Sequence, residues 1–96
     1  MKSETYLRLK ICTVLKREFP EIWIFHPAFI LRSGVPDLLI CYRGHFIALE
    51  VKTMVGKTSK IQDYVLTQIR NARGIAYVVR SVDDARKVLT GIKKAL

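Results

Sequence analysis

The sequence lacks the features that would place it in a membrane or an oxidising compartment. No apolar run approaches the roughly 18 residues that a membrane-spanning helix needs, and the first residues lead into a mixed stretch rather than an apolar signal-peptide core. Its two cysteines, Cys12 and Cys41, lie in apolar stretches, and neither belongs to a CxxC pair or a cluster with zinc spacing. We therefore expect an intracellular protein with two reduced core thiols and no membrane partner.

Acidic residues are also scarce. Lysine and arginine number 17 against 8 aspartates and glutamates, which gives a formal charge of +9. Such an excess attracts polyanions, chiefly nucleic acid, although lysines that only solvate helix faces would give the same count. The 96 residues contain no internal repeat, low-complexity tract or linker. We therefore expect one domain over residues 1–96, with nucleic acid as a possible partner.

Capping and periodicity signals predict seven secondary-structure elements. Ser3 can cap a first helix that runs to about Phe19, just before Pro20. A second helix should open with the capping box of residues 59–62 and end near residue 73, with Gly74 at the C′ position. Strands are expected at 22–26, 37–42, 45–52 and 75–80, and a last helix at 81–96. The order α-β-β-β-α-β-α predicts a mixed α/β domain with a central sheet flanked by helices.

The two middle strands carry the strongest signal. Only Arg43 and Gly44 separate them, which predicts a hairpin with a two-residue turn. In that register Asp37 lies directly opposite Glu50, with Cβ atoms about 4.5–5.5 Å apart on one face. Lys52, two residues after Glu50, points to the same face. Both faces are otherwise apolar along most of the hairpin, so helices or loops must cover both sides.

Two opposed carboxylates beside a buried surface have to share a proton or a cation. Carboxylate oxygens suit Mg²⁺, which proteins usually hold with one or two carboxylates plus phosphate and water. The carbonyl of Val51 is a candidate further ligand. Lys52 could orient a water molecule or stabilise charge developing on a phosphate. The chemistry that these parts suit is phosphodiester hydrolysis; the alternative is a surface salt bridge between Lys52 and one of the acids.

The residues that make up this constellation resemble a known family. Residues 32–37 read R-S-G-V-P-D, residues 49–52 read L-E-V-K, and residues 59–62 read S-K-I-Q. This succession is similar to the virus-type replication-repair nuclease (VRR-NUC) domain of the PD-(D/E)xK superfamily, over nearly the whole chain. The resemblance implies a restriction-endonuclease-like core and a metal-dependent endodeoxyribonuclease that uses Mg²⁺, with Mn²⁺ able to substitute. For free-standing phage and bacterial members it implies a DNA-repair homodimer acting on branched DNA such as four-way (Holliday) junctions, in the cytoplasm of a bacterial or phage-infected cell.

The family's functional residues can be carried over one at a time. Asp37 and Glu50 would be metal ligands, and Lys52 would be the catalytic lysine. Gln62 matches the family's helix glutamine, although it is also the fourth residue of the capping box. Glu4 matches an acid of the first helix and would be an outer metal-site residue, unless it only favours the helix dipole.

Several residues have weaker signals. Arg32, Lys57 and Lys60 are candidate contacts to DNA phosphates, and a solvated loop charge would explain each of them as well. A lone histidine in an apolar strand, His26, is more often structural than a general base. Trp23 is more typical of a core or an interface than of a base-stacking platform, and residues 23–31 are our candidate for a dimer interface.

Three rival functions remain open from the sequence alone. The protein could be a structure-selective endonuclease, including one for flaps or nicks, with no small-molecule substrate. It could be a basic module that binds nucleic acid without cutting, or a small packaging or interaction protein. A sequence-specific restriction enzyme is less suited to 96 residues, because the chain has little room for a target-recognition domain.

Overall fold

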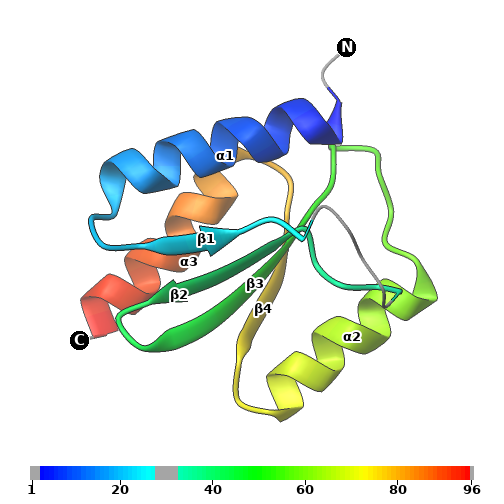
Figure 1. The fold of residues 1–96 in the computed structure, drawn as a ribbon. Helices are drawn as coiled ribbons and strands as arrows, with labels where there is room; N and C mark the ends of the chain where they lie inside the picture. The colour runs from blue at the N-terminus through cyan, green and yellow to red at the C-terminus, as the bar shows by residue number, and fades with distance from the viewer. Residues whose placement is uncertain (1–2, 28–32, 96) are drawn as a thin grey trace.

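The computed structural model describes residues 3–27 and 33–95. Its helices and strands follow the predicted order (Figure 1). Within the described ranges no helix has both the length and the apolar character needed to cross a membrane. The elements are α1 (Glu4–Glu18), β1 (Trp23–Phe25), β2 (Leu38–Tyr42), β3 (His45–Val51), α2 (Lys60–Asn71), β4 (Ile75–Val79) and α3 (Val82–Ala95).

The strands form a mixed sheet in the order β1-β2-β3-β4. β1 and β2, and β2 and β3, pair antiparallel, whereas β3 and β4 pair parallel. The hairpin turn has φ of 50° at Arg43 and 80° at Gly44, the two left-handed residues of a type I′ turn. This turn fixes the predicted register, which runs from Tyr42 opposite His45 to Leu38 opposite Leu49.

Helices cover both faces of the sheet, as the apolar hairpin requires. α1 and α3 lie together on one face, and α2 lies on the other (Figure 1). The larger core lies under α1 and α3, where strand side chains such as Ile40 and Leu49 meet Leu15 and Leu89. A smaller cluster under α2 is built around Ala48, Leu66 and Ala76.

The helix starts follow the sequence signals. Ser3 Oγ accepts the Tyr6 N–H at the start of α1, and Ser59 and Gln62 form the predicted capping box of α2. The prediction for the end of α2 is wrong by one residue: Arg73 (φ 74°) takes the left-handed C′ position and Gly74 follows it. Gly74 is needed there because a Cβ atom would lie 2.7 Å from Ile69 Cγ2.

One prediction about burial is corrected, and a second is narrowed to one of its alternatives. Cys12 is half-buried, but Cys41 is exposed, so the expectation of two core thiols is wrong for Cys41; both thiols are free. Trp23, which the sequence predicts to lie in a core or an interface, is 59 % exposed, so the core alternative is excluded and the interface alternative stays a prediction. Its ring stacks on that of Phe25, with centroids 6.0 Å apart, because alternate residues of a strand share a face.

Candidate active site

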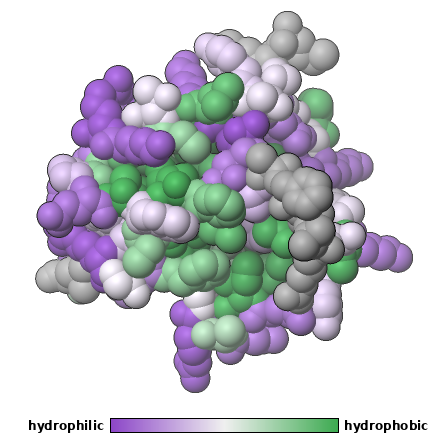
Figure 2. Space-filling model, in the orientation of Figure 1, coloured by the Kyte–Doolittle hydropathy of each residue, from purple (hydrophilic) through white to green (hydrophobic). Residues whose placement is uncertain are grey.

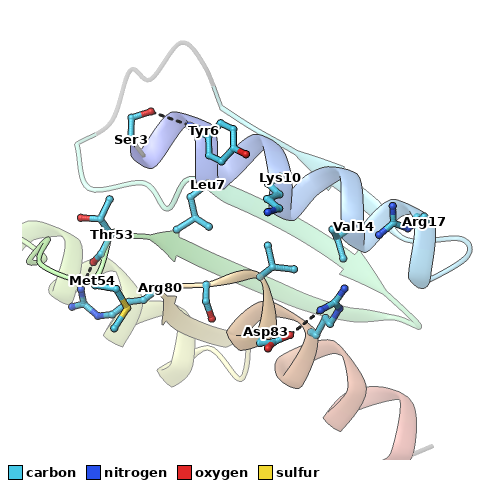
Figure 3. A pocket seen from close by; sticks show the side chains of 13 residues that line it. Ser3, Tyr6, Leu7, Lys10, Val14, Arg17, Thr53, Met54, Arg80 and Asp83 are labelled. Atoms are coloured by element: carbon cyan, nitrogen blue, oxygen red, sulfur yellow. Dashed lines mark hydrogen bonds and ion pairs between the residues drawn. The ribbon is translucent and has the colours of Figure 1, made fainter. Parts of the chain in front are cut away.

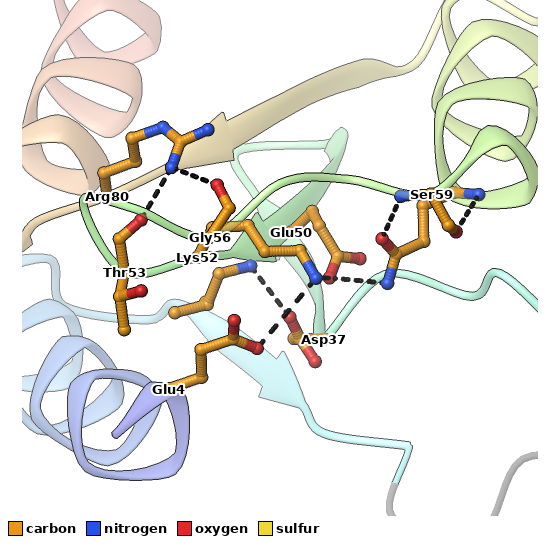
Figure 4. Close-up of polar contacts among 10 residues, drawn as sticks. Glu4, Asp37, Glu50, Lys52, Thr53, Gly56, Ser59 and Arg80 are labelled. Carbon is orange, nitrogen blue, oxygen red and sulfur yellow. Dashed lines mark hydrogen bonds and ion pairs between the residues drawn. The ribbon is translucent and has the colours of Figure 1, made fainter. Parts of the chain in front are cut away.

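Three predicted site residues meet at one end of the sheet. Asp37 directly precedes β2, Glu50 is the penultimate residue of β3, and Lys52 follows that strand. The side chains lie beside one another in Figure 4, with Glu4 of α1 approaching from the other side. The hairpin register therefore does what the sequence predicts, because extending it by one pair places Asp37 opposite Glu50.

Asp37 has a backbone role as well as its charge. Its Oδ2 accepts the Val51 N–H at 2.8 Å. If the ladder between β2 and β3 continued by one more hydrogen-bonded pair, Pro36 would have to be the partner of Val51. In an extended strand the N–H and the carbonyl of one residue point to the same side. The Val51 carbonyl would therefore face Pro36, and because proline has no N–H it cannot donate to this carbonyl. The Pro36-Asp37 pair thus ends the ladder beside Val51.

Glu50 is the most constrained charge of the site. Its side chain is buried, with 2 % of the residue exposed, and Oε1 is the buried side-chain atom that lacks a hydrogen-bond partner in the described part of the chain. Burial raises the pKa of Glu50 to about 8; the neighbouring Asp37 adds to the rise, Lys52 opposes it and Glu4 adds a little. Without a cation, this carboxyl therefore holds a proton near neutral pH.

Lys52 is the cation nearest to these acids. Its Nζ lies 3.7 Å from Glu50 Oε2 and 4.0 Å from Glu4 Oε1. The lysine is 9 % exposed as a residue, so its ammonium group is held between a buried and a half-exposed carboxylate. Glu4 lies on the rim of the site, where Gly56 lets it approach: a Cβ atom on Gly56 would lie 3.2 Å from Glu4 Oε2.

Gln62 caps α2 and also contacts the predicted site. Its Oε1 accepts the Ser59 N–H at 2.9 Å and so completes the cap of α2, while its Nε2 donates to Glu50 Oε2 at 3.3 Å. One amide can do this because its oxygen and its nitrogen point in different directions. The start of α2 is therefore joined directly to the buried carboxylate.

The chain before Asp37 is also shaped for this site. Gly34 has φ of 81°, and a Cβ atom there would lie 2.8 Å from Ile61 of α2, so only glycine allows this approach. His26 Nδ1 lies 2.8 Å from the Asp37 carbonyl oxygen. It holds the backbone of Asp37 and does not reach the carboxylates in the manner of a general base, in keeping with the structural role predicted for it.

The predicted phosphate contacts are less closely tied to the site. Lys57 and Lys60 are both exposed, on the loop before α2 and on its first residue. Arg32 lies outside the described residues. Sequence reasoning missed Arg80, whose Nη1 donates to the carbonyls of Thr53 and Gly56, at 2.6 Å each. No spacing in the sequence signals this contact, because Arg80 lies 27 and 24 residues away from these partners.

The donor set fits a hard divalent cation. Among residues 3–27 and 33–95 no group of three acids, histidines or cysteines could hold a metal by itself, so Glu4 is not placed as a third carboxylate ligand. Asp37 and Glu50 with the Val51 carbonyl form an all-oxygen set of the kind that Mg²⁺ binds together with water and phosphate. The unpartnered Glu50 Oε1 is an available oxygen for such an ion.

Comparison with known proteins gives a likeness to a solved structure. No protein-family model and no curated protein matches the sequence. A solved structure described as a "VRR_NUC domain" superposes with a TM-score of 0.69 and 25 % sequence identity, over 84 % of this chain and 91 % of the other. The fold and the motif residues agree with this likeness, which supports a domain of the VRR-NUC type.

Proposed function

We propose that the protein is a Mg²⁺-dependent endonuclease that cuts phosphodiester bonds in branched DNA, four-way junctions among them. The observation that carries the proposal is the state of Glu50: buried, opposite Asp37, 3.7 Å from Lys52 and with one unpartnered oxygen. A carboxylate pair in this state is a cost to a merely structural site, because like charges directly opposed destabilise a strand pair. It becomes favourable when a cation lies between the acids.

The residues divide the work by position. Asp37, Glu50 and the Val51 carbonyl would hold Mg²⁺, which when bound supplies Lewis acidity toward the phosphate and toward water. The Lys52 ammonium is placed to bind a non-bridging phosphate oxygen or to stabilise charge there. Gln62 keeps Glu50 Oε2 in place through its amide, and His26 keeps the backbone of Asp37 in place.

Branched DNA and a dimer belong to the same proposal. Resolving a four-way junction needs two cuts, and a two-fold dimer supplies two equivalent sites. Trp23 and Phe25 on the edge strand β1 are 59 % and 49 % exposed, and Phe46, which pairs with Cys41 on the same face, is 48 % exposed. We propose that these three side chains form the centre of the interface. Residues 28–31 of the predicted interface segment lie outside the described residues.

The test of the nuclease function uses conservative variants. Asp37→Asn, Glu50→Gln and Lys52→Met are incubated with a four-way junction, a nicked duplex and a linear duplex, with Mg²⁺, with Mn²⁺ or with EDTA. Each variant should lose cutting by about 100-fold or more, the scale of removing one preorganised electrostatic group, while binding persists because most of it comes from phosphate contacts. Lys93→Gln, an exposed change on α3, is the matched control.

Wild-type rates in any one of the three site variants would overturn the assignment. Binding without cutting by the wild-type chain, with either metal, would instead leave a non-cleaving DNA-binding module. Light scattering after size exclusion tests the dimer, and Trp23→Ser together with Phe25→Ser should shift the mass toward that of a monomer. A wild-type monomer at tens of micromolar that still cuts junctions symmetrically would contradict the dimer.

A further inference from the structure

A groove of about 660 Å³ opens between α1 and the start of α3. It lies beside the candidate site without sharing its acids: Ser3 directly precedes Glu4, and Thr53 directly follows Lys52. In Figure 3, Ser3, Thr53 and Met54 lie at one end of the groove and Arg17 lies at the other. The groove thus begins at the site and follows α1 for most of its length, about 21 Å at 1.5 Å per helical residue.

The lining combines an aromatic and apolar surface with positive charge. Tyr6 is 47 % exposed and Met54 is 77 % exposed, and Leu7 and Val14 lie between them and the far end. The charged residues that line the groove are four cations and one acid, namely Lys10, Arg17, Arg80, Arg86 and Asp83. Asp83 and Arg86 neutralise each other, because Arg86 Nη1 donates to Asp83 Oδ1 at 2.8 Å. The other charged residues of the lining, Lys10, Arg17 and Arg80, are all cations.

The walls of the groove are held by two arginines. Arg86 binds Glu18 with two parallel hydrogen bonds of 2.8 Å and so joins α3 to α1. Arg80 joins the end of β4 to the loop after Lys52, through the carbonyls of Thr53 and Gly56. The groove is therefore shaped before any ligand arrives, and little ordering of its walls opposes binding.

Unpaired nucleic acid has the chemistry that fits such a surface. Proteins bind single strands with a positively charged groove that follows the backbone and with aromatic side chains on which bases stack. The bases of a duplex are not available for such stacking, whereas those of a single-stranded arm or a frayed end are. On these grounds we infer that the groove between α1 and α3 binds the unpaired strand of a branched DNA substrate, with a base on Tyr6 and phosphates at Lys10 and Arg17.

This inference rests on the proposed function and deepens it, because it assigns the preference for branches to named residues. The strand would leave the duplex beside Lys52, pass over Met54 and follow α1. Duplex DNA would meet the site without filling the groove. Selectivity would then come from the groove, and cutting from the carboxylates.

The experiment measures binding in EDTA, where cleavage does not interfere. The probes are a fluorescent fork with single-stranded thymidine arms and the matched blunt duplex. The variants are Tyr6→Leu, which removes the ring; Tyr6→Phe, which keeps it; and Lys10→Gln. The controls are Tyr77→Leu, an exposed tyrosine on β4, and Lys93→Gln on α3; none of these residues was assigned to the metal site.

Tyr6→Leu should weaken fork binding about 5-fold or more, the lower end of a lost base–aromatic stack, and should leave duplex affinity within about 2-fold. Tyr6→Phe should bind the fork like wild type. Lys10→Gln should also weaken the fork selectively and should reduce its salt dependence by about one counterion. The two controls should not separate fork from duplex.

Equal losses on fork and duplex, or no loss on either, would overturn the inference. So would a change in dimer mass with Tyr6→Leu, since that would show a second copy in the groove. The proposed function can fail separately: a chain that binds forks through Tyr6 but never cuts would keep the groove and lose the nuclease.

Discussion

Neighbouring residues of β3 experience two different environments. Ile47, Leu49 and Val51 are fully buried among the large side chains under α1 and α3. Ala48 is equally buried, but it packs against α2 in a cluster of small extent, and Glu50 follows it on that face. The alternation of a strand thus places stability on one face and charge on the other.

The face of the sheet under α2 has a small core and a charged end. Figure 2 shows a mixture of apolar and polar side chains on the surface of this one view, without a continuous apolar coat. The face under α2 is closed by small residues, which let the helix approach closely, and toward its end it holds Glu50 and Lys52 at low exposure. Substitutions at the three consecutive residues 48 to 50 therefore test the small cluster under α2, the large core under α1 and α3, and the charged end of the sheet.

The largest effect should come from Leu49→Ala. The leucine side chain is fully buried, and its removal would leave a cavity among residues that cannot close it completely. We expect the free energy of unfolding to fall by about 2–5 kcal/mol, measured by urea denaturation in EDTA. A loss below 1 kcal/mol would mean that the face under α1 and α3 is not the tightly packed one.

Ala48→Leu should have an intermediate destabilising effect, caused by overpacking instead of by a cavity. The added atoms would have to fit between β3 and α2, where Ala48, Leu66 and Ala76 already touch. We expect a loss of about 1–3 kcal/mol from overpacking, and a weaker metal response because α2 carries Gln62. If the variant is as stable as wild type, α2 lies less tightly on the sheet than the structure shows.

The smallest effect should be a gain in the free energy of unfolding. Glu50→Gln keeps the shape and removes a buried acid that has to take up a proton when the chain folds near neutral pH. In EDTA the variant should therefore be more stable than wild type by about 0.5–2 kcal/mol. The expected pH dependence has a definite sign. The pKa of Glu50 is raised from 4.5 to about 8 in the folded chain. The contribution of Glu50 to the free energy of unfolding is therefore fully present below pH 4.5 and is lost as the pH rises through 8. Thermal unfolding from pH 5 to 9 should show a flatter profile for the variant.

Magnesium should favour wild type over Glu50→Gln. An ion that binds only the native state stabilises that state by mass action. Millimolar Mg²⁺ should therefore raise the Tm of wild type more than that of Glu50→Gln. A clear loss of stability for Glu50→Gln in EDTA would show that Glu50 makes a net favourable contact, such as that with Lys52. That result would support a structural ion pair instead of a prepared metal site.

Much of the site was predictable because local rules decide it. The two-residue turn at Arg43 and Gly44 fixes a register, and the register brings Asp37 to Glu50. The capping box was readable from Ser59 and Gln62. Sequence patterns of this kind describe neighbours along a helix or across a hairpin, so their reach is short.

The rest depends on tertiary contacts that no short pattern encodes. The bonds of Arg80 to the loop after Lys52 and of Arg86 to Glu18 connect distant elements. The second bond of Gln62, to Glu50, was not visible in the capping box itself. The exposure of Cys41 followed from an open stretch of sheet that α2 does not cover, whereas its apolar neighbours in the sequence indicated burial.

The acceptor that Asp37 provides for the Val51 N–H has an evolutionary consequence. Asparagine at position 37 could still accept that bond, and glutamine at position 50 would remove a repulsion. A lineage could therefore lose catalysis through either substitution and keep a folded protein with an intact basic surface. Under the proposed function only selection for cutting would preserve the two acids, and a descendant that binds DNA without cleaving it would lie one substitution away.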